Sequence, residues 1–200
     1  LNSVHIAIHT CLEGILCDLN LKQEEFLTSA RNDCFRIKKM ITNLQDLDKL
    51  EDITQTSEMH EESIKEILAE SARSMDIISS SKNVKIETEL SLLFDKIYCN
   101  KDQLQLVFNN LLDNAIQHSE VGDSVSIRLQ EKEKEISCLI HNRGSYIPAE
   151  YHARIFDKFF QIPHEESKRD GLGLYLAKKI IEQHGGKIGV RSSKRLGTTF

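Results

Sequence analysis

The chain has 200 residues, of which 40% are hydrophobic and 28% are charged, and its formal net charge is −5. This composition is typical of a globular protein with one large or two small cores, and it excludes a disordered chain. No stretch approaches the roughly 20 apolar residues of a membrane span, and no signal-peptide pattern opens the chain. The acidic balance, without a basic stripe interleaved with aromatic residues, argues against nucleic acid as a partner.

Five scattered cysteines form no C-x-x-C pair and have no histidine at zinc-ligand spacing, so we interpret them as reduced core thiols. They are Cys11, Cys17, Cys34, Cys99 and Cys138. Their odd number fits the cytoplasm better than a secreted disulfide scaffold. The chain starts within an apolar-periodic segment and stops within a strand pattern, so we expect a piece of a longer protein, with any membrane segment outside it.

Residues 1–52 predict a helical hairpin. Apolar residues recur at three-to-four spacing over residues 4–19 and again over residues 24–50. The break near Asn20 is too short for anything except an antiparallel hairpin. Because two helices alone bury too little surface to be stable, we expect a dimerisation unit, most simply a four-helix bundle with a second copy.

The first predicted helix has an isoleucine on its exposed side. At about 100° per residue, Ile6 projects away from the apolar stripe, while His5 and His9 lie at intermediate angles. The stripe itself consists of Val4, Ile8, Cys11, Leu12 and Ile15.

From residue 57 the pattern changes, and residues 57–200 predict a second domain. Its helices are expected near residues 61–78, 102–119 and 172–184, and its strands at residues 84–90, 96–99, 124–130, 135–141 and 187–192. Helices mixed with mostly antiparallel strands predict an α+β sandwich, in which helices cover one face of a sheet.

Three segments of this domain carry candidate chemistry. Asn110, Asn114 and His118 follow one another by single turns along a flank of the helix 102–119. A carboxamide oxygen is a neutral, hard ligand for a Mg²⁺ ion that already carries nucleotide phosphates, although a solvated flank explains the row equally well. Gly171 and Gly173 stand at the start of the next helix, where backbone N–H groups attract phosphate; tight-turn geometry is the alternative. Asp170 is its candidate capping residue and Gly185 its stop.

The third segment follows the strand 135–141. Asn142 at the strand end can recognise a flat polar edge such as that of adenine, and Gly144 allows the backbone to approach the ring. The aromatic residues Phe156, Phe159 and Phe160 are expected to anchor a loop rather than stack on a ligand. The polar stretch 161–170 is expected to form a mobile cover over a binding site.

Taken in order, these segments resemble the ATP-binding domain of sensor histidine kinases, the branch of the Bergerat-type ATPases that serves bacterial two-component signalling. FNNLLDNAIQHS resembles the N box of that family, HNRGSYIP its first glycine box and RIFDKFF its F box. DGLGLYLAKKIIEQHGG and GTTF resemble its second and third glycine boxes. The five motifs fall in the order of the family within residues 104–200.

The resemblance implies an ATP site in which Asn114 binds Mg²⁺, Asn110 helps to hold the metal and phosphates, and Asn142 meets the adenine amino group. The other nucleotide-binding residues that it implies are His118, Gly144, Ile147, Gly171, Leu172, Gly173 and Thr198. Three positions depart from the family pattern: Asn142 replaces aspartate, Tyr146 replaces glycine, and Gln117 replaces a cation. We therefore expect nucleotide binding that is retained but weak.

The hairpin resembles the dimerisation and histidine-phosphotransfer domain of the same kinases. When the first helix is laid on the pattern V-S-H-E-L-R-T-P-L, the phosphoacceptor histidine falls on Ile6 and its acidic neighbour on Ala7. Isoleucine has no nitrogen to phosphorylate. A shift that moves His5 into place makes a poor apolar stripe, and His9 lies one turn along, rotated by roughly 60°.

Three functional hypotheses follow. The first is a Mg-ATP-binding, histidine-kinase-like core without its acceptor, acting as a regulatory pseudokinase, as a homodimer or paired with a related kinase. The second is an active sensor kinase that phosphorylates His5 or His9 and passes the phosphoryl group to a response-regulator receiver aspartate. The third, a Bergerat-fold ATPase of chaperone or DNA-repair type, is disfavoured because the hairpin ahead of the nucleotide domain is the kinase arrangement.

Overall fold

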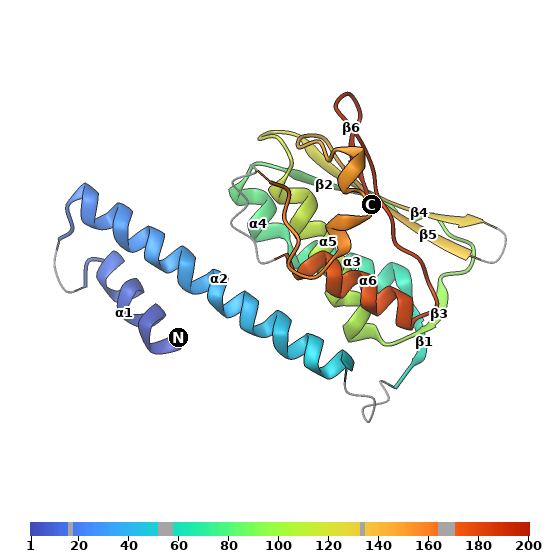
Figure 1. The fold of residues 1–200 in the computed structure, drawn as a ribbon, viewed down its shortest axis with the longest axis horizontal. Coiled ribbons are helices and arrows are strands. Elements are labelled where there is room, and N and C mark those ends of the chain that lie inside the picture. The colour runs from blue at the N-terminus through green and yellow to red at the C-terminus, as the bar shows by residue number, and fades with distance from the viewer. Residues whose placement is uncertain (16–17, 52–57, 133–134, 164–170) are drawn as a thin grey trace.

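A long helical hairpin lies beside an α/β body in the computed structural model (Figure 1), which describes residues 1–15, 18–51, 58–132, 135–163 and 171–200. The hairpin consists of α1 (Asn2–Leu12) and α2 (Leu21–Glu51). Helix α1 packs along the N-terminal half of α2, and α2 continues past it beside the body, here residues 58–200. The predicted boundary between residues 52 and 57 lies outside the described residues.

The bounds of the two hairpin helices differ from those that the sequence pattern predicted. Helix α1 stops at Leu12 instead of residue 19, and Gly14, with a φ of +68°, follows its end. Helix α2 starts three residues early because Asn20 and Gln23 form a reciprocal cap: each side chain accepts a hydrogen bond, 3.0 Å long, from the backbone N–H of the other residue.

The hairpin leaves much apolar surface open. No residue of α1 is buried, and Ile6 is 64% exposed, as the helical periodicity predicted. Along α2 the exposed large apolar side chains are Leu21, Phe26, Phe35, Ile37, Met40, Ile41 and Leu44. A set of this extent exceeds the scattered apolar residues of an ordinary surface.

The first elements of the α/β body differ from the sequence prediction. The single helix expected over residues 61–78 is instead a strand, β1 (His60–Ser63), followed by α3 (Ile64–Ser74) and α4 (Asp76–Ser81). Strand β1 pairs antiparallel with β3 (Lys96–Cys99), and the periodicity of the sequence could not show this distant partner.

Ser63 makes the transition from β1 to α3. Its hydroxyl oxygen accepts a hydrogen bond from the Glu66 N–H at 3.3 Å, which caps the helix, and the same hydroxyl donates to the Asp95 carboxylate. This donation lowers the pKa of Asp95 below its ordinary value, because a hydrogen bond to the charged form favours it.

The main sheet has five strands in the order β2-β4-β5-β7-β6. Their bounds are β2 Lys85–Glu89, β4 Ser124–Lys132, β5 Glu135–Asn142, β6 Arg191–Ser193 and β7 Gly197–Thr199. Strand β2 runs parallel to β4, and the other pairs are antiparallel. The strand predicted over residues 187–192 was therefore placed too early, since only Arg191–Ser193 pairs with β7.

Helices cover one face of this sheet. Val125, Ile127 and Leu129 alternate along β4 with Arg128 and Gln130, and only the first three are buried. Helix α5 (Lys101–Gln117) packs on β4 and β5, with α3 on one side and α6 (Gly173–Gln183) on the other. Two short 3-10 helices, Ala149–Tyr151 and Arg154–Phe156, complete the body. The predicted α+β architecture is confirmed.

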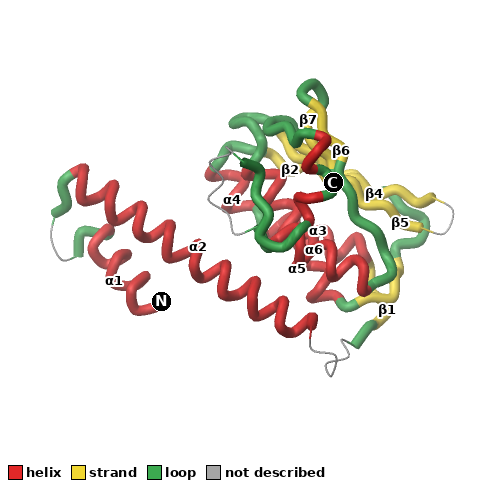
Figure 2. The backbone as a smooth tube through the Cα atoms, in the orientation of Figure 1, coloured by secondary structure: helices red, strands yellow, loops and turns green. Residues whose placement is uncertain are grey.

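Helix α2 runs beside the α/β body (Figure 2) and makes contacts between the hairpin and the body. Helix α2 contacts α6, and Asn43 and Leu47 are buried although the rest of α2 is largely exposed. The Gln183 side chain donates a 3.1 Å hydrogen bond to the Leu50 carbonyl, and Lys39 forms an ion pair with Asp113 of α5.

The cysteines of the described residues are free thiols, as predicted, but the prediction that all of them are core residues is wrong, because Cys11 and Cys34 are only half-buried on the hairpin. Burial raises the pKa of Cys138 to about 12 and also raises that of Cys99, so neither thiol forms a reactive thiolate at neutral pH. Cys17 lies outside the described residues. None of the described helices is both long enough and apolar enough for a membrane span.

The position of α5 at the centre of the body gives a stability prediction. Leu112 is fully buried, and Leu93 is 89% exposed. Leu112→Ala is expected to lower the free energy of unfolding by about 3 kcal/mol, because the cavity it leaves adds to the lost transfer free energy. Leu93→Ala is expected to change it by less than about 0.5 kcal/mol. Urea denaturation followed by circular dichroism measures both, and equal losses would contradict the arrangement.

Candidate functional site

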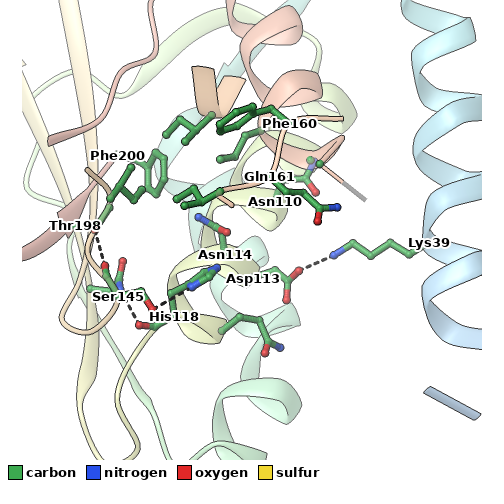
Figure 3. Close-up of a pocket in the computed structure, with 18 of the residues that line it drawn as sticks. Lys39, Asn110, Asp113, Asn114, His118, Ser145, Phe160, Gln161, Thr198 and Phe200 are labelled. Atoms are coloured by element: carbon green, nitrogen blue, oxygen red, sulfur yellow. Dashed lines mark hydrogen bonds and ion pairs between the residues drawn. The ribbon is translucent and has the colours of Figure 1, made fainter. Parts of the chain in front are cut away.

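A cavity of about 750 Å³ lies between the hairpin helix α2 and the α/β body. Figure 3 shows its polar side chains from α5, the segment after β5 and strand β7, together with Lys39 reaching in from α2. Of the ten nucleotide-binding residues expected from the sequence, eight line this cavity: Asn110, Asn114, His118, Asn142, Ile147, Gly171, Gly173 and Thr198. Residues more than 80 positions apart in the chain therefore meet in one place.

The row on α5 supplies the polar floor. Asn110, Asn114 and His118 all line the cavity, as their one-turn spacing predicted (Figure 3). Asn110 is only 8% exposed, and its Nδ2 has no hydrogen-bond partner among the described residues. An unpaired buried amide is costly, so a native protein keeps one where a ligand or ordered water satisfies it.

The end of β5 is tied to the end of α5. Asn142 is 1% exposed, and its Nδ2 donates to the carbonyl oxygens of His118 and Arg143, each at 3.4 Å. The Ser145 N–H donates to the same His118 carbonyl at 3.1 Å. These bonds hold the segment after β5 against the last turn of α5.

Gly144 is required by this contact. It has a φ of +134°, and a Cβ at this position would lie 2.0 Å from the His118 carbonyl oxygen. Gly144 does not line the cavity, although its neighbour Ser145 does. The structure explains this glycine by the close approach of two protein backbones, where the sequence analysis had assigned it to contact with a base.

A chain of hydrogen bonds positions the wall formed by Ile147 and Thr198. The Ile147 N–H donates to Ser192 Oγ at 3.0 Å, and Ser192 Oγ lies 2.7 Å from Thr198 Oγ1. Thr198 Oγ1 donates to the Ser145 carbonyl at 3.0 Å. The segment GTTF thus joins the cavity through the Thr198 hydroxyl.

The two glycines at the start of α6 differ in their surroundings. Gly171 has a φ of +69°, and a Cβ there would lie 2.7 Å from the Phe159 carbonyl carbon, so tight-turn geometry accounts for it. At Gly173, which opens α6, a Cβ would lie 3.1 Å from Asn110 Oδ1. Leu172 is fully buried and does not line the cavity.

Apolar residues form the opposite wall of the cavity: Ile155, Phe160, Ile162, Leu174 and Phe200. Phe156 is buried with its ring 6.3 Å from that of Phe200, so it anchors its loop as predicted. Phe160 lines the cavity, which the sequence analysis did not foresee, while Phe159 is 54% exposed. Of the expected cover 161–170, Gln161 and Ile162 line the cavity, and residues 164–170, with Asp170, lie outside the described residues.

Helix α2 contributes to the cavity, which the sequence had not indicated. Phe35, Arg36, Lys39 and Met40 line the cavity, and Lys39 Nζ lies 2.5 Å from Asp113 Oδ2 (Figure 3). The side chain of Asp113 is 13% exposed and that of Lys39 is 52% exposed. Asp113 lies within the N-box sequence and could have been inferred, but nothing in the sequence indicates which face of α2 meets the body.

The histidines of α1 have unequal environments. His5 is half-buried with its ring edge-on to Phe35, 4.6 Å between centroids, and its Nε2 is buried without a hydrogen-bond partner among the described residues. The side chain of His9 is 55% exposed, and its Nδ1 lies 3.6 Å from Glu13 Oε1. Within the described ranges, no three histidine, cysteine, aspartate or glutamate side chains gather as a metal site.

Comparison with known proteins assigns the ATPase part of this chain, residues 99–200, to a family. The histidine kinase-, DNA gyrase B-, and HSP90-like ATPases match residues 99–200. The sensor protein SrrB of Staphylococcus aureus is 36% identical over 113 residues, which cover 52% of this chain and 19% of SrrB. This chain therefore spans only a small part of the curated relatives that it matches.

Solved structures of histidine kinases have a fold similar to that of this chain. The catalytic domain of the histidine kinase ThkA is 25% identical, with a TM-score of 0.63 over 72% of this chain and 92% of that domain. Full-length ShkA in complex with AMPPNP has a TM-score of 0.72 over 99% of this chain and 44% of its own, but at 20% identity it shows the fold alone.

The chain belongs to the histidine kinase-, DNA gyrase B-, and HSP90-like ATPase family. Within that family its relatives are sensor histidine kinases, and the ATPase domain is of the sensor histidine kinase type, as the five motifs predicted.

Gly144 gives a prediction for the site. Gly144→Ala is expected to separate the segment after β5 from α5, because its methyl group would overlap the His118 carbonyl. We expect a loss of unfolding free energy of about 2 kcal/mol or more. Gly189→Ala is the control, since a Cβ there meets no atom within 4 Å. Thermal unfolding measures both variants, and a Gly144→Ala variant as stable as Gly189→Ala would refute the contact.

Proposed function

We propose that this chain is the core of a two-component signalling protein that binds Mg-ATP in the cavity between α2 and the α/β body. The observation that carries the proposal is the convergence of the asparagine row, the end of β5 and the start of α6 on one cavity of about 750 Å³. That volume lies within the range of small-molecule and cofactor sites, roughly 300 to 1,000 Å³. The division into residues 1–52 and 57–200 belongs to the same proposal.

The residues at the floor fit a metal-bound triphosphate. Asn110 has a buried amide nitrogen that pairs with none of the described residues and is a donor for a phosphate oxygen. Asn114 offers a neutral oxygen to Mg²⁺, which prefers oxygen ligands and takes several of them from phosphates and water. Mg²⁺ supplies charge neutralisation to the phosphates when bound. Gly173 leaves room beside Asn110 at the start of α6, where helix N–H groups attract phosphate.

Asn142, Ile147 and Thr198 form the proposed base end of the site. The Asn142 carboxamide oxygen can accept a hydrogen bond from the adenine amino group, and the apolar wall can pack against the ring. A neutral amide acceptor is weaker than a carboxylate, so we expect modest affinity. His118 and Gly171, which also line the cavity, complete the proposed nucleotide-binding set, whereas Gly144 and Leu172 do not line it.

The hairpin is proposed to form a four-helix bundle with a second copy or with a related kinase. The supporting observation is that α1 has no buried residue and that α2 carries exposed apolar residues that do not line the cavity: Leu21, Phe26, Ile37, Ile41 and Leu44. Covering such surface is the main favourable term in association. A response-regulator receiver domain is the proposed downstream partner, and the histidine kinase ThkA, which has a similar fold, has been solved in complex with the response regulator protein TrrA.

Ile6 makes a regulatory or partner-dependent pseudokinase the preferred function. It occupies the position of the phosphoacceptor histidine in the family pattern, it is exposed as an acceptor must be, and it has no nucleophilic atom. Ala7 likewise lacks the carboxylate expected beside the acceptor.

An active kinase is the second candidate, and His9 is its better acceptor. His9 is exposed and has the Glu13 carboxylate 3.6 Å away, which can orient the imidazole, whereas His5 packs against Phe35.

Asn114→Ala tests the nucleotide site. We expect this variant to bind ATP about tenfold or more weakly in the presence of Mg²⁺, because the metal loses a protein ligand. Asn109→Ala is the matched control, since Asn109 lies on the same helix, hydrogen-bonds Ser74 at 3.2 Å and does not line the cavity. Isothermal titration calorimetry measures both affinities. No ATP binding by the unaltered chain would refute the proposal.

Labelling with γ-labelled ATP and Mg²⁺ separates the two kinase hypotheses. A pseudokinase is expected to acquire no acid-labile, base-stable label, whereas Ile6→His combined with Ala7→Glu restores both the nucleophile and its acidic neighbour and is expected to acquire it. Label on the unaltered chain that disappears in His9→Ala or His5→Ala would instead establish the active kinase.

A further inference from the structure

Helix α2 forms one wall of the cavity. Asn32, Phe35, Arg36, Lys39 and Met40 recur at three-to-four spacing, so one stripe of α2 faces the cavity. These residues lie outside the ATPase family match, which starts at residue 99. The site in this protein therefore consists of more than the family domain.

Among the described residues that line the cavity, the lysine and arginine side chains belong to α2. Within residues 99–200, the described lining residues include one carboxylate, that of Asp113, and no lysine or arginine. Arg36 and Lys39 of α2 are the cations that line the cavity within the described part of the chain. Without α2 this described lining would present a negative formal charge to an incoming polyphosphate, and like charges at short range repel.

Lys39 lies where its positive charge offsets the negative charge of Asp113 in the cavity lining. Its Nζ lies 2.5 Å from Asp113 Oδ2 (Figure 3). Arg36 instead pairs with Asp33 on its own helix, at 3.1 Å. The side chain of Lys39 is 52% exposed, so it is not locked by packing. A lysine ammonium on a four-carbon stem can move between neighbouring oxygen acceptors and is a common phosphate ligand.

We propose that Lys39 is a phosphate ligand of the bound nucleotide, supplied to the ATPase domain by the hairpin, and that Asp113 holds it at the cavity until nucleotide arrives. The inference rests on the proposed ATP site and adds a specificity determinant to it. It makes the preference for ATP over adenosine depend on a residue of α2. It also makes the phosphates compete with Asp113 for one cation, so nucleotide binding loosens the contact between the hairpin and the body.

Substitutions of Lys39 and of Asp113 are expected to change the affinity for Mg-ATP in opposite directions. Lys39→Met is expected to weaken Mg-ATP binding about tenfold, because a charge-assisted contact to phosphate is lost, and to leave adenosine binding unchanged. Lys39→Arg is expected to retain most of the ATP affinity. Asp113→Asn is expected to strengthen Mg-ATP binding severalfold, since it removes both the competing carboxylate and its repulsion. The control is Lys49→Met, which removes another α2 lysine in an ion pair, 3.4 Å from Asp46, away from the cavity.

Calorimetric titration of the full 200-residue chain with Mg-ATP and with adenosine tests the proposal, with thermal unfolding to verify that each variant folds. Opposite changes for Lys39→Met and Asp113→Asn, seen for ATP and absent for adenosine, support it. Equal weakening by both variants would make the pair a structural latch and overturn the proposal. Wild-type ATP affinity in Lys39→Met would overturn it too. If the unaltered chain binds neither ligand, the proposed function itself fails.

Discussion

The carbonyl oxygen of His118 accepts the Ser145 N–H at 3.1 Å and the Asn142 side chain at 3.4 Å, and the site depends on this junction. It joins the last turn of α5 to the end of β5, and through Ser145 it reaches the Thr198 hydroxyl of β7. Only glycine at position 144 permits so close an approach. The asparagine row, the adenine end of the proposed site and the last strand of the sheet are thereby held in one rigid arrangement.

A second constraint comes from charge. A cavity for a triphosphate must balance several negative charges, yet Asp113 adds another at its floor. Arg36 and Lys39 of the hairpin bring positive charge to the cavity. The 2.5 Å contact between Lys39 and Asp113 shows how close the hairpin and the α/β body lie. The hairpin therefore lines the cavity of the proposed nucleotide site and also carries the proposed dimerisation surface.

Local patterns predicted most of the secondary structure. Strand β3 was placed at its observed residues, and α5 and α6 were each placed to within two residues at either end, because strong apolar periodicity and good stop signals coincide there. The errors fall where a distant partner decides. Residues 60–63 form a strand because β3 lies alongside, and residues 187–190 do not, because β7 pairs only with Arg191–Ser193.

The sequence by itself determined the fold class, the family, the flank shared by Asn110, Asn114 and His118, and the exposure of Ile6. Each of these follows from residue spacing along one element or from motifs of the chain. Tertiary structure alone decided which face of α2 meets the body, why Gly144 must be glycine, and that Leu172 points into the interior. These facts depend on backbones and side chains that meet across more than 25 residues of sequence, and no local periodicity encodes such a meeting.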